Sequence, residues 1–92
     1  MTEIRWSPEA AGDLENIVSR IRRDNPEAAR QVAEIIYNRC ASLDNFPDRG
    51  RIGRIAGTSE LVFAPLPYIV VYRVKPSTVE IVRIYHSAQN WP

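Results

Sequence analysis

The 92 residues predict an α+β domain in which a helical hairpin packs on one face of a mainly antiparallel, twisted sheet. The first half contains two segments with apolar residues at three- and four-residue spacing, which is typical of amphipathic helices. The second half contains three short runs of β-branched and aromatic residues with short connections, which indicates antiparallel strands. The expected order is β-α-α-β-β-β over one domain, residues 1–92.

The first half begins with a short strand, expected at residues 3–6. Ser7-Pro8 then predicts a helix start, because serine caps helices and proline is tolerated at their first position. Asn25-Pro26 repeats this signal, so one helix ends near Asp24 and a second begins at Pro26. The apolar positions expected to face the core are Ala10, Leu14, Ile17, Val18 and Ile21 on the first helix and Ala29, Val32, Ala33, Ile36, Cys40 and Leu43 on the second.

The second half opens with a basic segment that is broken up by Pro47, Gly50, Gly53 and Gly57, and we expect a flexible connection there. Strands are then expected at 60–66, 68–74 and 79–86. The last two are apolar on both faces, which predicts central strands covered on both sides. The strand at residues 3–6 is expected to pair with one of the strands of the second half.

Charge is distributed unevenly along the chain. Residues 1–48 hold six arginines against nine acids, a net charge of −3, whereas residues 49–92 hold five arginines and one lysine against two acids, a net charge of +4. Arg49, Arg51 and Arg54 cluster in the glycine-bearing segment, with no acid between Asp48 and Glu60. We therefore expect this cluster to bind an acidic or phosphate-bearing partner rather than to be only solvated.

Several function classes are excluded by what the chain contains. The glycines of RGRIGRIAG fit neither a dinucleotide fingerprint nor a phosphate loop. With a single histidine and a single cysteine on separate elements, we expect no metal site and no cofactor. Cys40 is expected to be a small core residue rather than a nucleophile.

No apolar run is long enough to span a bilayer, and the N-terminus does not resemble a signal peptide, so a cytoplasmic protein is expected.

Four segments of the chain carry a resemblance to a known family. The opening WSPEA, the segment FPDRGRIGR, the run GTSELVFAPLPYIVVYRV and the ending YHSAQNWP resemble the RelE/ParE superfamily of bacterial type II toxin-antitoxin toxins, also described as plasmid stabilisation proteins. The likeness covers essentially the whole chain. It implies a growth-arresting toxin that is neutralised by a cognate antitoxin, whose acidic C-terminal segment would wrap the basic half in a salt-sensitive complex.

The branches of this superfamily differ in whether the toxin is an enzyme. The resemblance implies either a ParE-like, non-enzymatic inhibitor of DNA gyrase or a RelE- or YoeB-like endonuclease that cuts mRNA at the ribosome. Metal-free RNA cleavage needs an acid, a base and cations around the phosphate. His86, Arg73 and Arg83 are the candidate catalytic residues for that case, and His86 matches a C-terminal strand histidine of some of these ribonucleases.

Two departures from the ribonuclease pattern favour the gyrase-inhibitor interpretation. Ile69 stands where those nucleases place an arginine, and Ser59 stands where the superfamily usually has another. Arginine also replaces the lysines of the RelE loop and cannot donate a proton at neutral pH. The same departures leave open a third class, a degenerate antitoxin-binding module without toxicity.

The candidate binding residues for a protein target are Arg49, Arg51, Arg54, Tyr68 and Trp91. Each candidate also has a purely structural alternative. His86 and the tyrosines fit sheet packing and hydrogen bonding, Trp91 fits the edge of a core, and Arg73 and Arg83 fit cross-strand pairs with Glu60 or Glu80.

Overall fold

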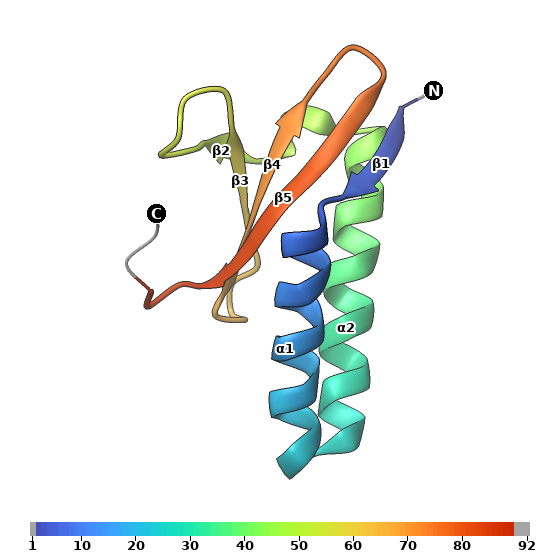
Figure 1. Cartoon of the computed structure of the whole chain (residues 1–92), viewed down its shortest axis with the longest axis vertical. Helices are drawn as coiled ribbons and strands as arrows, with labels where there is room; N and C mark the ends of the chain where they lie inside the picture. The colour runs from blue at the N-terminus through green and yellow to red at the C-terminus, as the bar shows by residue number, and fades with distance from the viewer. Residues whose placement is uncertain (1, 90–92) are drawn as a thin grey trace.

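The computed structural model describes residues 2–89, and these form two helices on one face of a five-stranded sheet (Figure 1). This confirms the predicted fold class. In chain order the elements are β1 (Glu3–Trp6), α1 (Pro8–Asp24), α2 (Pro26–Ala41), the 3-10 turns η1 (Ser42–Asp44) and η2 (Pro47–Arg49), β2 (Arg51–Ile52), β3 (Ser59–Val62), β4 (Tyr68–Val74) and β5 (Thr78–His86). In this part of the chain neither helix has the length and apolar character needed to cross a membrane.

Both helices begin as their sequences predict. The Ser7 hydroxyl accepts a hydrogen bond from the Ala10 N–H (3.0 Å), and the Asn25 side chain accepts one from the Ala28 N–H (3.1 Å). These bonds satisfy amide groups that a helix leaves without partners in its first turn. Pro8 and Pro26 occupy the first helical positions, where no amide hydrogen is needed.

The sheet has the order β1-β5-β4-β3-β2, which is antiparallel except for the parallel pair β1 and β5. β1 therefore pairs with a strand of the second half, as predicted. β4 and β5 are central, and both of their faces are covered. One face packs against the helices, and on the other Ile69, Val71 and Tyr85 are at most 5% exposed.

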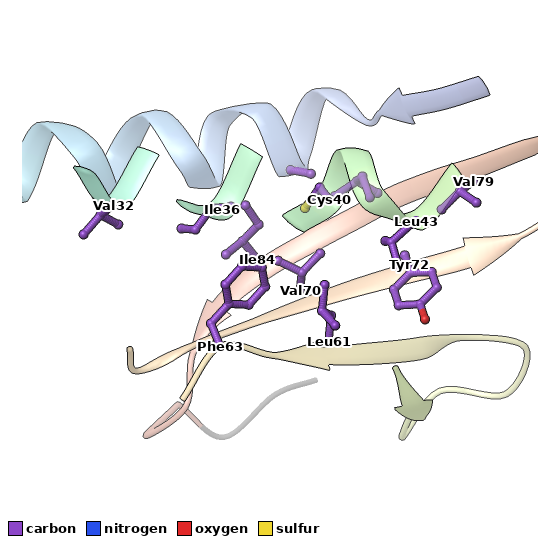
Figure 2. Close-up of a cluster of buried hydrophobic side chains, with 12 residues drawn as sticks. Val32, Ile36, Cys40, Leu43, Leu61, Phe63, Val70, Tyr72, Val79 and Ile84 are labelled. Carbon is purple, nitrogen blue, oxygen red and sulfur yellow. The ribbon is translucent and has the colours of Figure 1, made fainter. Parts of the chain in front are cut away.

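The main core lies between the helical hairpin and the sheet (Figure 2). Ile36, Cys40 and Leu43 are fully buried there, against Phe63, Val70 and Tyr72 of the sheet side. Burial raises the pKa of the Cys40 thiol to about 12, which keeps it protonated and unreactive at neutral pH. The prediction that Cys40 is a core residue is confirmed.

The register between β4 and β5 shifts by one residue. Val71 faces Arg83, but Tyr72 faces Ile81, so Val82 has no direct partner on β4. Such a bulge redirects the side chains around it. Ile81 and Ile84 consequently both face the helices, and Arg83 turns toward α1.

Two sequence predictions are wrong in detail. The strand expected over 60–66 ends at Val62, because the chain turns back toward β4 between Phe63 and Tyr68. The segment expected to be a flexible connection contains η2 and the short strand β2, and hydrogen bonds tie it to the sheet.

Candidate functional site

Residues 47–58, which we call the basic loop, carry Arg49, Arg51 and Arg54 and are anchored by two buried side chains. The first anchor is Tyr72 of β4, which is fully buried. Its hydroxyl donates to the Pro47 carbonyl (2.8 Å) and accepts from the Gly50 N–H (2.9 Å). A β-carbon on Gly50 would lie 2.6 Å from the Tyr72 hydroxyl and from the Glu60 carbonyl, so only glycine fits this close approach.

The second anchor is Glu60 of β3, which is 1% exposed. Its carboxylate accepts from Nε and Nη2 of Arg51 (3.2 and 3.0 Å) and from the Arg54 backbone N–H (3.1 Å). Burial alone would raise the pKa of Glu60, but the bonds from Arg54 and Arg51 outweigh it and leave the pKa below its ordinary value. The basic cluster, which has no acid between Asp48 and Glu60 in the sequence, therefore has an acidic neighbour in the fold, Glu60.

Arg49 and Arg51 lie together at the β3 edge of the sheet. They line a depression of about 310 Å³ with Arg39 of α2, Glu60 and Val62. The Arg39 guanidinium lies 5.1 Å from the centre of the Phe63 ring, and Arg49 donates to the Ser42 hydroxyl (2.9 Å). Three arginines against one carboxylate make this hollow basic.

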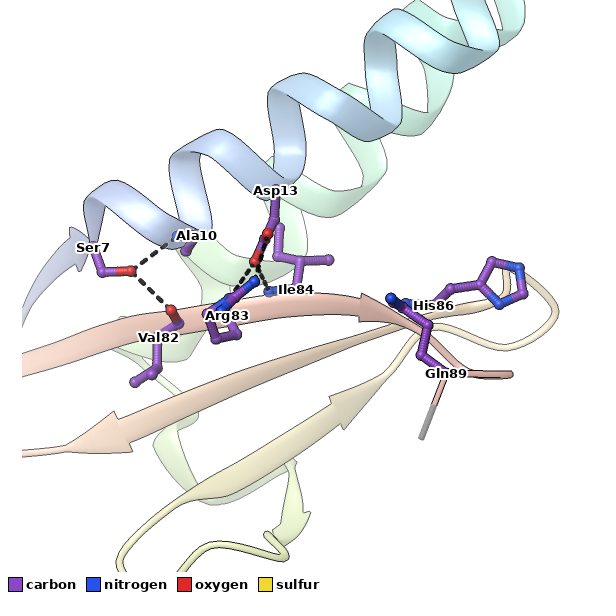
Figure 3. Close-up of polar contacts among 8 residues, drawn as sticks. All are labelled: Ser7, Ala10, Asp13, Val82, Arg83, Ile84, His86 and Gln89. Atoms are coloured by element: carbon purple, nitrogen blue, oxygen red, sulfur yellow. Dashed lines mark hydrogen bonds and ion pairs between the residues drawn. The ribbon is translucent and has the colours of Figure 1, made fainter. Parts of the chain in front are cut away.

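Arg83 belongs to a different cluster, which lies between β5 and α1 (Figure 3). Its Nε and Nη2 donate to the two oxygens of Asp13 (2.8 and 3.1 Å), and Asp13 also accepts from the Ile84 N–H (2.9 Å). The bonds from Asp13 raise the pKa of Arg83. The alternative partners expected for Arg83, Glu60 and Glu80, are wrong, because the bulge turns this side chain toward α1.

Asp13 and Ser7 together close the edge of β5. β1 ends at Trp6, opposite Ile81, so the following residues of β5 have no strand neighbour on that side. The Ser7 hydroxyl donates to the Val82 carbonyl (2.8 Å), and Asp13 binds the Ile84 N–H. Asp13 and Ser7 thus have a structural role, because they satisfy backbone groups at the edge of the sheet.

His86, at the end of β5, lies in a groove of about 320 Å³ between α1 and β5, lined also by Asn16, Arg20 and Tyr68. Its ring meets the Tyr68 ring edge to face, with 5.8 Å between centres. His86 Nδ1 accepts a hydrogen bond from the Ala88 N–H (3.0 Å), so in the neutral ring the proton lies on Nε2. In this tautomer Nε2–H can donate a hydrogen bond, but neither ring nitrogen has a free lone pair to take a proton from a 2′-hydroxyl.

The three candidate catalytic residues do not form one site. Arg73 pairs with Glu80 (3.8 Å), as expected, and lies on the face of β4 opposite to Tyr68, Val70 and Tyr72. His86 faces Tyr68, which is five residues from Arg73 along β4, a separation of about 17 Å. Arg73 and His86 therefore cannot contact the same phosphate group, and Arg83 is already paired with Asp13.

The other predicted binding residues are Tyr68 and Trp91. Tyr68 is half-buried and packs against the core, which supports its structural role. The prediction for Trp91 lies outside the described residues. Residues 2–89 contain no group of three histidine, cysteine or acidic side chains close enough to hold a metal ion.

Sequence reasoning missed Arg39, Arg20, Asp13 and the anchoring role of Glu60. Asp13, Asn16 and Arg20 recur at three- and four-residue spacing, so helical periodicity could have placed them on one face of α1. The partners of Arg39 and Glu60 come from segments distant in the chain, and no local signal marks them.

A helical hairpin on a sheet of this order is the architecture of the RelE/ParE class of toxins. A chain of the chromosomal ParDE TA system from P. aeruginosa superposes with a TM-score of 0.86 at 26% identity, over 94% of this chain and 96% of that one. A chain of the toxin-antitoxin complex RelBE2 from Mycobacterium tuberculosis shares the fold, with a TM-score of 0.63 at 23% identity over 92% of this chain and 96% of that chain.

Residues 4–91 match the model of the family described as ParE toxin of type II toxin-antitoxin system, parDE, and the chain belongs to this family. It is 42% identical to Y4kP of Sinorhizobium fredii over 97% of this chain and 92% of that protein. It is also 37% identical to the toxin RelE2 of Caulobacter vibrioides, over 97% and 99% of the two chains. The protein is thus a type II toxin of the ParE/RelE group.

Proposed function

We propose that this protein acts in the bacterial cytoplasm as a ParE-like inhibitor of DNA gyrase, without chemistry of its own. The observation that carries the proposal is the dispersal of the candidate catalytic groups. Arg73 and His86 lie on opposite faces of the sheet, and the only acceptor on Arg83 among the described hydrogen bonds is the Asp13 carboxylate. Cleavage of RNA without a metal needs such groups around one phosphate.

The basic loop is the surface we assign to the target. Tyr72 and Glu60 fix its backbone, so Arg49, Arg51 and Arg54 are held in place before any partner arrives. A rigid loop loses little conformational entropy on binding, which favours affinity. A cognate antitoxin neutralises the toxin in this proposal, in keeping with a solved ParDE relative.

The test combines toxicity with two sets of variants. Reversal of Arg49, Arg51 and Arg54 to glutamate should abolish growth arrest, and His86→Ala should leave it unchanged. Reversal of the exposed Arg5, Arg22 and Arg23 changes the net charge equally and is the matched control. Circular dichroism of each variant checks folding. The purified parent should inhibit gyrase supercoiling, and induced cells should show a DNA damage response and filamentation.

The competing function is a ribosome-dependent mRNA endonuclease, and one observation favours it. His86 is exposed in a groove that also contains Arg20, so a cation lies near the single histidine. For a nuclease, His86→Ala should lower cleavage by roughly 10² to 10⁴ fold. Translation arrest with mRNA cuts that vanish in His86→Ala would refute the gyrase proposal. Harmless expression of the parent chain would instead support the degenerate, non-toxic alternative.

A further inference from the structure

One apolar side chain of the basic loop takes no part in the core. Ile52 of β2 is 93% exposed, the highest value among the large apolar side chains described in residues 2–89, and the next, Phe46, is 62% exposed. Single exposed apolar residues are ordinary on protein surfaces. Exposure alone therefore assigns no role to Ile52, and its surroundings decide whether it has one.

The backbone on both sides of Ile52 is held in place. Ile52 pairs with Ser59 of β3, whose side chain is too small to cover an isoleucine. The Gly53 N–H donates to the Thr58 carbonyl (2.9 Å), and the Thr58 hydroxyl donates to the Ile55 carbonyl (2.6 Å). Isoleucine is branched at Cβ and has few side-chain conformations. Ile52 is thus presented to solvent in a fixed position, and a partner that binds it orders little of the chain.

Positive charge surrounds Ile52 on the loop. Arg49, Arg51 and Arg54 each lie within three residues of it, so their Cα atoms are at most about 11 Å from its own. A stable protein interface covers about 800 Å² on each partner, which is a patch of about 16 Å in radius. A protein that covers Ile52 therefore also meets these arginines.

We propose that Ile52 is the apolar anchor of the contact with gyrase and enters a hydrophobic pocket of the gyrase protein that has an acidic rim. The inference rests on the proposed gyrase function and adds the chemistry of the partner surface. An anchor that fills a desolvated pocket, with neighbouring contacts that exclude water, supplies much of the binding energy of a protein interface. The arginines around it favour a rim of the opposite charge.

DNA fits the loop less well than a protein pocket does. Some proteins insert apolar side chains between base pairs, but such binding also depends on many contacts between phosphates and available cations. Glu60 already accepts hydrogen bonds from the Arg51 guanidinium (3.0 and 3.2 Å), so a phosphate would have to displace this carboxylate. The whole chain also carries a net charge of only +1.

The first experiment exchanges the anchor for another cation. If the loop acted by charge alone, Ile52→Lys would bind gyrase at least as well as the parent. If Ile52 fills an apolar pocket, affinity and inhibition should fall at least about tenfold. Surface plasmon resonance with purified gyrase measures the affinity, and a supercoiling assay measures the inhibition. Unchanged or stronger binding of Ile52→Lys would overturn the proposal.

Thermal unfolding checks that the substitution acts on binding and not on the fold. Because Ile52 is 93% exposed, Ile52→Lys should melt within about 4 °C of the parent. A larger fall would show that this side chain supports the fold and would contradict its assignment as an anchor.

A second set of variants removes apolar surface without adding charge. Ile52→Ser should lose at least about tenfold in affinity for gyrase, and Ile52→Val, which keeps most of the side chain, should lose less than about fivefold. Ile35→Ser on α2 is the control. Ile35 is only 38% exposed, so its loss should cost more stability than the loss of Ile52, yet gyrase binding should stay as in the parent. Equal affinity of Ile52→Ser and Ile35→Ser would rule out an anchor at Ile52.

Salt separates the anchor from the charges around it. Screening weakens interactions between exposed charges but not the burial of an apolar side chain. Raising the salt concentration should therefore weaken the binding of the parent and of Ile52→Ser by the same factor, so that the ratio of their affinities stays constant. Convergence of the two affinities at high salt would contradict the proposal.

The same measurements distinguish this inference from the gyrase function itself. A parent chain that neither binds nor inhibits gyrase would refute both. Equal inhibition by the parent and Ile52→Lys would refute the anchor alone. Binding of linear DNA that is lost in Ile52→Ser would identify DNA as the occupant and overturn the proposal. So would weaker binding of Ile52→Lys to the product of the neighbouring reading frame with gyrase inhibition unchanged, since Ile52 would then belong to the antitoxin contact.

Discussion

Removing a single oxygen from Tyr72 should loosen the basic loop while leaving the core filled. In Tyr72→Phe the ring keeps its place, but the Pro47 carbonyl and the Gly50 N–H each lose a partner. A typical intramolecular hydrogen bond contributes about 0.5 to 1.5 kcal/mol. Two such bonds give a loss of about 2 kcal/mol in the free energy of unfolding.

Thermal unfolding followed by circular dichroism measures this loss. For a domain of this size 1 kcal/mol shifts the melting temperature by about 4 to 8 °C, so Tyr72→Phe should melt about 8 to 16 °C lower. Tyr37→Phe removes a hydroxyl from a tyrosine that is 59% exposed and should melt within about 2 °C of the parent. If both variants melted together, the Tyr72 hydroxyl would not be an anchor, and the account of a fixed basic loop would fail.

The remaining predictions concern Glu60, Cys40 and Asp13. The pKa of Glu60 is lowered in the folded protein, so its carboxylate stabilises the fold above its ordinary pKa of 4.5, and this stabilisation is lost as the pH falls through the folded pKa. In Glu60→Gln the free energy of unfolding should therefore change less with pH below about 4.5 than in the parent, as urea unfolding would measure. Cys40, with a pKa of about 12, should resist iodoacetamide at pH 8 until urea unfolds the chain, as mass spectrometry would show. Asp13→Ala should lower the free energy of unfolding by about 1 to 3 kcal/mol, chiefly because the Ile84 N–H loses its acceptor. Arg83 is too exposed for its ion pair with Asp13 to contribute much. A loss below about 0.5 kcal/mol would refute the role of Asp13 in closing the edge of the sheet.

The helices could be predicted because their signals are local. Ser7-Pro8 and Asn25-Pro26 mark helix starts through bonds that span three residues, and the structure places both starts where the sequence does. The apolar spacing of α2 likewise predicted buried Ile36 and Cys40. Such features depend on neighbouring residues and not on the rest of the fold.

The ends and bends of the strands could not be predicted in the same way. β3 stops at Val62 although apolar residues continue to Phe63, because its length depends on where β4 is available. The bulge at Val82 has no sequence mark, yet it decides that Arg83 binds Asp13 and not a neighbouring strand. Pairing between distant segments determines both.

The sequence identified several residues of the candidate site, but not how they are arranged in space. The cluster of Arg49, Arg51 and Arg54 is evident in the sequence, but only the fold shows that Glu60 neutralises Arg51 and that Arg39 joins from α2. Similarly, His86 was identifiable as the single histidine, whereas its separation from Arg73 follows from the register of β4 and β5.

The position of β5 sets an order on the folding of a newly made chain. β5 is the last strand of the domain, yet it lies between β4 and β1, and β1 has no other partner in residues 2–89. Ser7 also starts α1 with the same hydroxyl that holds the Val82 carbonyl. Synthesis of these residues takes roughly 5 to 20 s at bacterial rates, and the sheet cannot close before its final strand has left the ribosome. Until synthesis reaches β5, β1 therefore has no strand to pair with and the Ser7 hydroxyl has no Val82 carbonyl to bind, so the N-terminal strand has to wait several seconds for its place in the sheet.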